Sequence, residues 1–129
     1  MRRALQVVIA ILSLAPFGFG LTNLYVGAAR YMPKEAVNAG IDSQFRFESG
    51  IYFSIALLLW WMIPRIERVT VPFRIVVLGI FIGALGRVLS YLQLGPAPGF
   101  AAFGMFFELS LILLLIWQAK VAKDHAGSA

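Results

Sequence analysis

Four apolar stretches, each close to the length that crosses a lipid bilayer, occupy most of this 129-residue chain. Because a helix rises about 1.5 Å per residue, about 20 apolar residues span the hydrocarbon core. Hydrophobic residues make up 60% of the chain and charged residues only 13%, about half the share of charge in a soluble domain. The pattern predicts an all-α integral membrane bundle of four transmembrane helices. It argues against a soluble enzyme, a nucleic-acid-binding module and a disordered tail.

The whole chain, residues 1–129, is expected to form a single membrane domain. The spans are expected at about 4–26, 45–63, 73–94 and 100–119, with a polar external loop at 27–44 and a frayed cytoplasmic tail at 120–129. The first apolar run is too long for a cleaved signal peptide, so it is interpreted as a span, kinked near Pro16. The second span is expected to start with Asp42 or Ser43 as its N-cap and to stop at Pro64.

The orientation follows from the cations that flank the spans. Only Arg30 and Lys34 lie in the expected external loop. The cations expected on the other side are Arg2, Arg3, Arg65, Arg68, Arg74, Lys120 and Lys123. By the positive-inside rule, both termini are predicted to be cytoplasmic, in the inner membrane of a bacterium. Trp60, Trp61 and Trp117 then lie near the inner interface, where aromatic side chains anchor spans.

Polar residues inside the spans are the strongest functional signal, because lipid does not solvate them. By helical rise, Arg87 lies roughly 10 Å below Leu94 and Glu108 roughly 12 Å below Phe100. Each span thus places one strongly polar group in the outer half of the bundle. These groups and their neighbours form the predicted ligand-binding site: Asn23, Glu48, Tyr52, Arg87, Ser90, Tyr91 and Glu108.

Helical spacing assigns faces to the remaining small and polar residues. Gly79, Gly83 and Gly86 share a face with Arg87 and are expected to let a neighbouring helix approach closely. The first span carries a comparable stripe of small and polar residues, consisting of Gln6, Ser13, Gly20, Asn23 and Gly27. On the second span, Arg46 lies about 200° around the helix from Glu48. We therefore expect Glu48 to face inward, and Arg46 to reach the surface or to contact Asp42.

Three segments carry a family resemblance: "FRFESGIY", "GRVLSYLQLGPAP" and "FFELSLILLLIW". Over about residues 20–118 the chain resembles an uncharacterised family of short bacterial four-helix membrane proteins, a numbered domain of unknown function. The pattern of that family falls on Arg46, Glu48, Gly50, Gly86, Arg87, Ser90, Gly95, Pro96 and Glu108. The resemblance implies a four-helix membrane fold and names no substrate.

Several functions are compatible with this polar centre. The preferred hypothesis is a pocket that binds an amphipathic ligand, such as a lipid or quinone head group, with Arg87 holding an anionic or carbonyl oxygen. One alternative is an accessory subunit of a larger membrane complex or a homo-oligomer, in which Glu48, Arg87 and Glu108 form a purely structural ion-pair core. Another is a proton-coupled small-solute carrier that cycles Glu108.

An enzyme is the least favoured class, because no nucleophile–base pair lies at a shared depth. A glutamate acting as acid and base on a lipid remains an alternative. We expect no catalytic residue, cofactor or nucleic-acid partner. The chain has no cysteine, and its single His125 has no accompanying ligands, so we expect no metal site.

Overall fold

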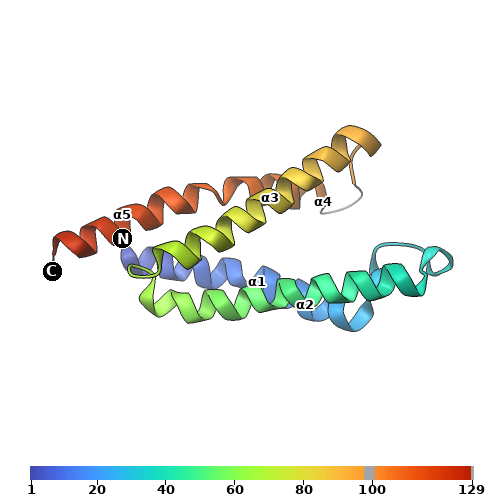
Figure 1. Ribbon diagram of the computed structural model, residues 1–129, viewed down its shortest axis with the longest axis horizontal. Coiled ribbons are helices and arrows are strands. Elements are labelled where there is room, and N and C mark those ends of the chain that lie inside the picture. The colour runs from blue at the N-terminus through green and yellow to red at the C-terminus, as the bar shows by residue number, and fades with distance from the viewer. Residues whose placement is uncertain (98–100, 129) are drawn as a thin grey trace. The chain divides into compact units, whose positions relative to one another are not determined.

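The computed structural model describes residues 1–97 and 101–128, and those residues contain helices but no strand. The principal helices are α1 (Arg2–Val26), α2 (Ala39–Met62), α3 (Thr70–Leu94), α4 (Ala101–Ser110) and α5 (Leu113–Gly127) (Figure 1). Short 3₁₀ helices lie in the connections: η1 (Ala28–Arg30), η2 (Lys34–Ala36) and η3 (Ile63–Arg65). The all-α fold class is therefore confirmed.

Four helical segments of the described chain are long and apolar enough to cross a membrane. They are Arg2–Val26, Ala39–Arg65, Thr70–Leu94 and Ala102–Gly127. Each of them contains most of one span expected from the sequence. The first continues through Pro16 without interruption.

The second membrane-length helix begins earlier than expected, at Ala39. Asn38 has extended backbone angles, and its side-chain oxygen accepts a hydrogen bond from the Ile41 N–H at 2.9 Å. Asn38 is therefore the N-cap. The expectation that Asp42 or Ser43 caps this helix is wrong, because Asp42 lies inside the first turn and contacts the preceding loop instead.

The expected fourth span is divided into α4 and α5 by a tight turn. The Leu111 N–H bonds the Glu108 carbonyl at 3.3 Å, and the Leu114 N–H bonds the Leu111 carbonyl at 2.9 Å. Both are i→i−3 bonds of the 3₁₀ type. The Ser110 hydroxyl also donates to the Phe107 carbonyl at 2.6 Å, a contact that bends helices. No glycine or proline marks this break in the sequence.

The expectation of a frayed tail is also wrong over residues 120–127, because α5 continues to Gly127. The run "WQAKVAKDHA" is rich in alanine and lysine, which favour a helix even where apolar burial is limited. Polar composition was therefore a poor indicator of disorder in this segment.

The chain divides into two compact units, which are described separately. Arg3–Pro64 forms the α1–α2 unit. Met1–Arg2 and Arg65–Ala129 form the α3–α5 unit.

Polar contacts join α1 and α2 into an antiparallel hairpin. The Gln6 side chain donates to the Ile63 carbonyl at 2.8 Å. Farther along α1, the Trp60 indole N–H donates to the Ser13 hydroxyl at 2.8 Å. Trp60 was expected to be an interfacial anchor, but its polar atom lies within the hairpin. Such bonds satisfy groups that an apolar medium leaves unsolvated.

The same face of α1 packs closely against α2 through one glycine. The Phe17 ring packs at a tilt against the rings of Phe53 and Trp60, with centroids 5.5 and 5.1 Å away. A Cβ on Gly20 would lie 2.7 Å from the Phe53 backbone nitrogen and 2.8 Å from its Cα. The stripe of small and polar residues on α1 is therefore a helix-packing surface.

We expect Gly20→Ala to destabilise the α1–α2 hairpin, because the added methyl group meets backbone that cannot turn aside. Overpacking of this kind costs about 2 kcal/mol. Gly18→Ala is the matched control, since a Cβ there meets nothing within 4 Å. Thermal denaturation in mild detergent should show a lower midpoint for Gly20→Ala only. Equal midpoints for both variants would contradict this close packing.

The connection between α1 and α2 is fixed by Arg46 and Asp42. The Arg46 guanidinium donates through Nη1 to the Leu24 and Tyr25 carbonyls at 2.6 and 2.8 Å, and through Nε to Asp42 at 2.7 Å. The expected Arg46–Asp42 contact is confirmed. The arginine also caps carbonyls that the end of α1 leaves without helical partners.

Gly27 follows α1 directly, and its backbone lies close to the Arg46–Asp42 pair. Its φ is +77°, and a Cβ would collide with the Asp42 carboxylate and the Arg46 guanidinium. The second oxygen of Asp42 accepts a hydrogen bond from the Ala28 N–H at 2.9 Å. Only glycine adopts a positive φ readily and has no Cβ, so only glycine fits here without strain.

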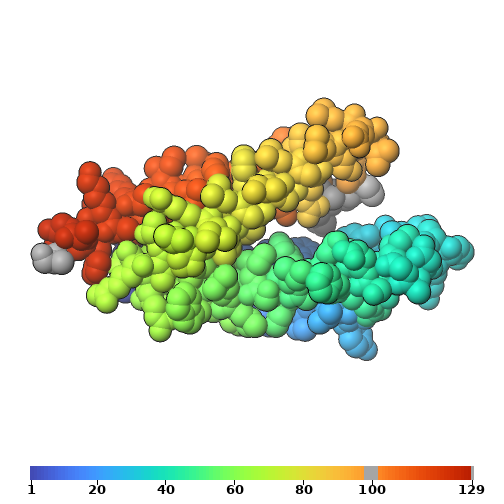
Figure 2. Space-filling view, viewed as in Figure 1, coloured from blue at the N-terminus to red at the C-terminus, as the bar shows by residue number. Residues whose placement is uncertain are grey.

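Gln118 ties α5 to the beginning of α3. Its side chain is fully buried and donates to the Ile66 carbonyl at 2.8 Å and to the Thr70 hydroxyl at 3.0 Å. Nearby, the buried Phe73 and Val121 contribute to the core of the unit. In the space-filling view, the side chains of α3 in yellow and of α5 in red lie against one another (Figure 2).

The glycine face of α3 does not pack within its unit as expected. No atom of the α3–α5 unit lies within 4 Å of a Cβ built on Gly79, Gly83 or Gly86. Helix α3 contacts α4 and α5, and its buried residues include Val76, Val77 and Ala84 but none of these glycines.

Candidate functional site

The side chains of Arg87 on α3 and Glu108 on α4 form a direct ion pair. Arg87 Nε lies 2.8 Å from Glu108 Oε2, and Nη2 lies 3.3 Å from Oε1. Such a two-point contact fixes the plane of the guanidinium as well as its position. The Glu108 side chain is 14% exposed and the Arg87 side chain 50%. The Glu108 side chain is therefore largely enclosed, while half of the Arg87 side chain stays accessible.

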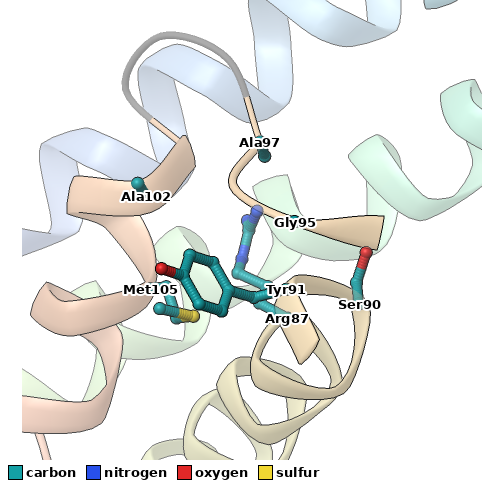
Figure 3. Close-up of a pocket in the computed structure, with 7 residues that line it drawn as sticks. All are labelled: Arg87, Ser90, Tyr91, Gly95, Ala97, Ala102 and Met105. Atoms are coloured by element: carbon teal, nitrogen blue, oxygen red, sulfur yellow. The ribbon is translucent and has the colours of Figure 1, made fainter. Parts of the chain in front are cut away.

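Arg87 borders a cavity of about 100 Å³ between the end of α3 and the start of α4. The cavity is lined by Arg87, Ser90, Tyr91, Gly95, Ala97, Ala102 and Met105 (Figure 3). Tyr91 extends towards α4, and the Ser90 hydroxyl lies on the other side of Arg87. We call this cavity the Arg87 pocket. Three of the seven predicted ligand-binding residues line it.

The polar side chains of the Arg87 pocket can all donate hydrogen bonds, and the two hydroxyls can also accept them. Glu108 uses Nε and Nη2 of Arg87, which leaves Nη1 without a described partner. The hydroxyls of Ser90 and Tyr91 have no hydrogen bond to the part of the chain that the structure describes. Arginine and hydroxyl donors together suit an anionic or carbonyl oxygen.

Two backbone features position these donors. Gly95 ends α3 with φ +85°, and its N–H bonds the Tyr91 carbonyl at 2.9 Å. A glycine in this conformation stops the helix directly after the donor-bearing turn. On the other side, the tight turn that ends α4 begins at the Glu108 carbonyl. Glu108 is thus close to the end of α4, whereas Arg87 lies about two turns before the end of α3.

The other predicted site residues belong to the α1–α2 unit. The Asn23 side-chain oxygen accepts hydrogen bonds from Arg30 at 3.1 Å and from the Tyr31 hydroxyl at 3.3 Å. Glu48 accepts one from Gln44 at 2.8 Å. Tyr52 is half-buried on α2. A ligand-binding role for these three residues stays a prediction.

Glu48 lies off the face of α2 that packs against α1. That face carries the buried Ser49 and Ala56, and adjacent residues differ by about 100° around a helix. Glu48 is exposed on its own unit. It is therefore not part of the α1–α2 interface.

Two buried polar residues of the α3–α5 unit were not singled out from the sequence. The Glu67 side chain is only 6% exposed and lies 2.9 Å from Arg2 Nε. Gln118 is fully buried. The position of Gln118 inside the apolar run "LLLIWQAK" was an available signal, whereas Glu67 looks like one more charge in a polar turn. In the described residues, no group of three or more histidine or acidic side chains could hold a metal ion.

Four helices that are long and apolar enough to cross a membrane indicate a multi-pass membrane protein. Over residues 4–119 the chain matches the family model described as "Domain of unknown function (DUF4345)", and the chain belongs to this family. The resemblance expected over residues 20–118 is confirmed and extends across the first helix. No curated protein and no solved structure matches the chain.

Proposed function

We propose that this chain is a multi-pass protein of a bacterial inner membrane whose Arg87 pocket binds the head group of an amphipathic ligand. The membrane assignment is supported by the surfaces of the four apolar helices. Only 28, 22, 17 and 11% of their most apolar windows are buried within the chain. Such extensive apolar surface is stable when lipid covers it and is a liability in water.

The half-exposed Arg87 side chain on the pocket wall is the observation that carries the ligand proposal. Its charge is balanced by Glu108, so the pair alone is neutral, and the Ser90 and Tyr91 hydroxyls add polar groups to the pocket wall. A purely structural ion pair has no need of further polar side chains around an adjoining cavity. The arrangement suits a phosphate, carboxylate or quinone oxygen.

The pocket is large enough for a head group and too small for an acyl chain. At about 100 Å³ it holds only a few non-hydrogen atoms. Exposed apolar side chains adjoin its lining residues in the sequence, with Leu94 86%, Phe103 67% and Phe106 66% exposed. An apolar tail could lie along these side chains. This combination favours an amphipathic ligand over a small soluble one.

Replacing Arg87 should release the ligand. We expect Arg87→Gln to lower the amount of co-purifying lipid or quinone at least tenfold, because a charged hydrogen bond contributes about 2 kcal/mol. The measurement is mass spectrometry of organic extracts from protein purified in mild detergent. Lys34→Gln, on the exposed η2 turn, removes the same charge outside the pocket and is the control. Unchanged extracts from both Arg87→Gln and Glu108→Gln would refute the binding proposal.

The proposed orientation places both termini in the cytoplasm, because cations flank the spans mainly on that side. The chain has no cysteine, so single cysteines report sidedness without a background. We expect a membrane-impermeant maleimide to label Ala36→Cys in intact spheroplasts. Ala126→Cys should be labelled only after permeabilisation. The reverse pattern would overturn the orientation and leave the pocket proposal standing.

A further inference from the structure

Cationic side chains gather at one end of the α3–α5 unit. The bonds from Gln118 to Ile66 and Thr70 hold the later part of α5 beside the start of α3. The two helices are antiparallel, so charges near the start of α3 and near the end of α5 lie at the same end (Figure 1). We call this surface the cationic end and define it by Arg68, Arg74, Lys120 and Lys123.

Little negative charge opposes the cationic end. All four of its defining side chains are on exposed residues, and Arg68 is 73% exposed. Glu67, next to Arg68 in the sequence, is buried and pairs with Arg2 at 2.9 Å, whereas its other oxygen is 3.9 Å from Arg68. Among the described residues of α5, the only acidic one is Asp124, which directly follows Lys123. Four cations therefore face one exposed carboxylate, and the surface has a net positive charge.

Exposed apolar side chains lie close in the sequence to the cations on α3 and precede them on α5. On α3, Val71 and Ile75 are 68 and 66% exposed. On α5, Leu113 and Ile116 are 63 and 70% exposed. In the proposed membrane these apolar side chains lie in the bilayer, so the cations next to them are at the level of the phospholipid head groups. A phospholipid covers both, with its acyl chains on the apolar residues and its phosphate on the cations.

We propose that the cationic end is a binding surface for the phosphate head groups of anionic phospholipids. The site is separate from the Arg87 pocket. Arg87 lies 17 residues beyond Thr70 on the same helix, which places it roughly 26 Å along the helix axis. The two proposals can therefore fail independently.

Native mass spectrometry of the full-length protein tests this proposal. Protein in mild detergent is titrated with phosphatidylglycerol or with phosphatidylcholine of the same acyl chains, and the bound lipids are counted. The variants are Arg68→Gln/Arg74→Gln and Lys120→Gln/Lys123→Gln, which alter different helices. The matched control, Arg30→Gln/Lys34→Gln, removes the same charge from the loop of the α1–α2 unit. Circular dichroism confirms that each variant keeps its helical content.

We expect wild-type protein to retain phosphatidylglycerol in preference to phosphatidylcholine. A cation near an anionic head group strengthens its binding about fivefold, so each double variant should lose up to about 25-fold of this preference. The control should keep it. Raising the salt concentration should weaken the preference of the wild type and have less effect on the variants.

Three results would overturn the proposal. The first is equal retention of the two lipids by wild-type protein. The second is a control that loses as much preference as the two test variants. The third is displacement of phosphatidylglycerol by an equal concentration of glycerol 3-phosphate, which would identify a soluble phosphate as the ligand. A loss of preference in only one test variant would still support the surface and would assign it to that helix.

Discussion

Replacing Arg46 by glutamine is expected to give the largest loss of stability of any single side-chain change outside the pocket. The variant loses the Nη1 bonds to the Leu24 and Tyr25 carbonyls and the Nε bond to Asp42. Hydrogen bonds from charged groups contribute about 1.5–3 kcal/mol each, and exposure reduces that value. The Arg46 side chain is 38% exposed, so we expect a total loss of about 3 kcal/mol. SDS-induced unfolding monitored by circular dichroism measures it.

Arg46→Lys separates the effect of charge from that of geometry. A lysine ammonium keeps the positive charge, but it lacks the planar guanidinium that bonds two carbonyls and a carboxylate at once. We expect it to recover less than half of the stability that Arg46→Gln loses. Lys34→Gln, on the same connection but exposed, should change the stability by less than about 0.5 kcal/mol. Full recovery by lysine would show that charge, and not capping, holds this connection.

Reversing the charge of Arg87 is expected to give the second large loss of stability. Arg87→Glu places two carboxylates where an ion pair was. We expect a loss of about 3 kcal/mol, the lower end of the range for breaking a buried pair, because Arg87 is half exposed. The double variant Arg87→Glu/Glu108→Arg restores opposite charges and should recover most of the stability.

The same double variant should not recover ligand binding. The arginine would then be on α4, and the carboxylate would take its place beside Ser90 and Tyr91 on the pocket wall. Mass spectrometry of the bound lipids, on protein whose stability has been restored, separates the two roles. Ligand retention that returns together with stability would show that the pair only fixes helix packing.

Hydropathy alone was sufficient to predict the four membrane-length helices, because a bilayer requires long apolar runs and leaves few alternatives. Helix ends were less predictable. Asn38 is one of several polar residues in its loop, so composition did not indicate that it is the N-cap. The break after Ser110 depends on local hydrogen bonds, which composition does not indicate either. The error at residues 120–127 arose because polar character was treated as disorder, although the local helix propensity is high.

The candidate site was partly predictable, because the position of a residue along a helix gives its depth in the bilayer. Arg87 and Glu108 could be matched by depth, since helical rise converts sequence position into distance along the bilayer normal. Depth does not specify how each helix is rotated about its own axis, or which of several possible hydrogen-bond partners each polar group has. Gln44 as the partner of Glu48, and Arg30 and Tyr31 as partners of Asn23, could not be obtained from it.

Long apolar helices with a few polar groups inside the spans follow from the sequence alone, because the length and hydropathy of a run are local properties. Tertiary structure decided how each polar group is used. It assigned Arg46 to capping α1, Ser13 and Gly20 to packing against α2, and Arg87 to an ion pair beside a cavity. The physical reason is that hydrogen bonds and ion pairs act over about 3 Å, so their partners depend on which residues the fold brings into contact.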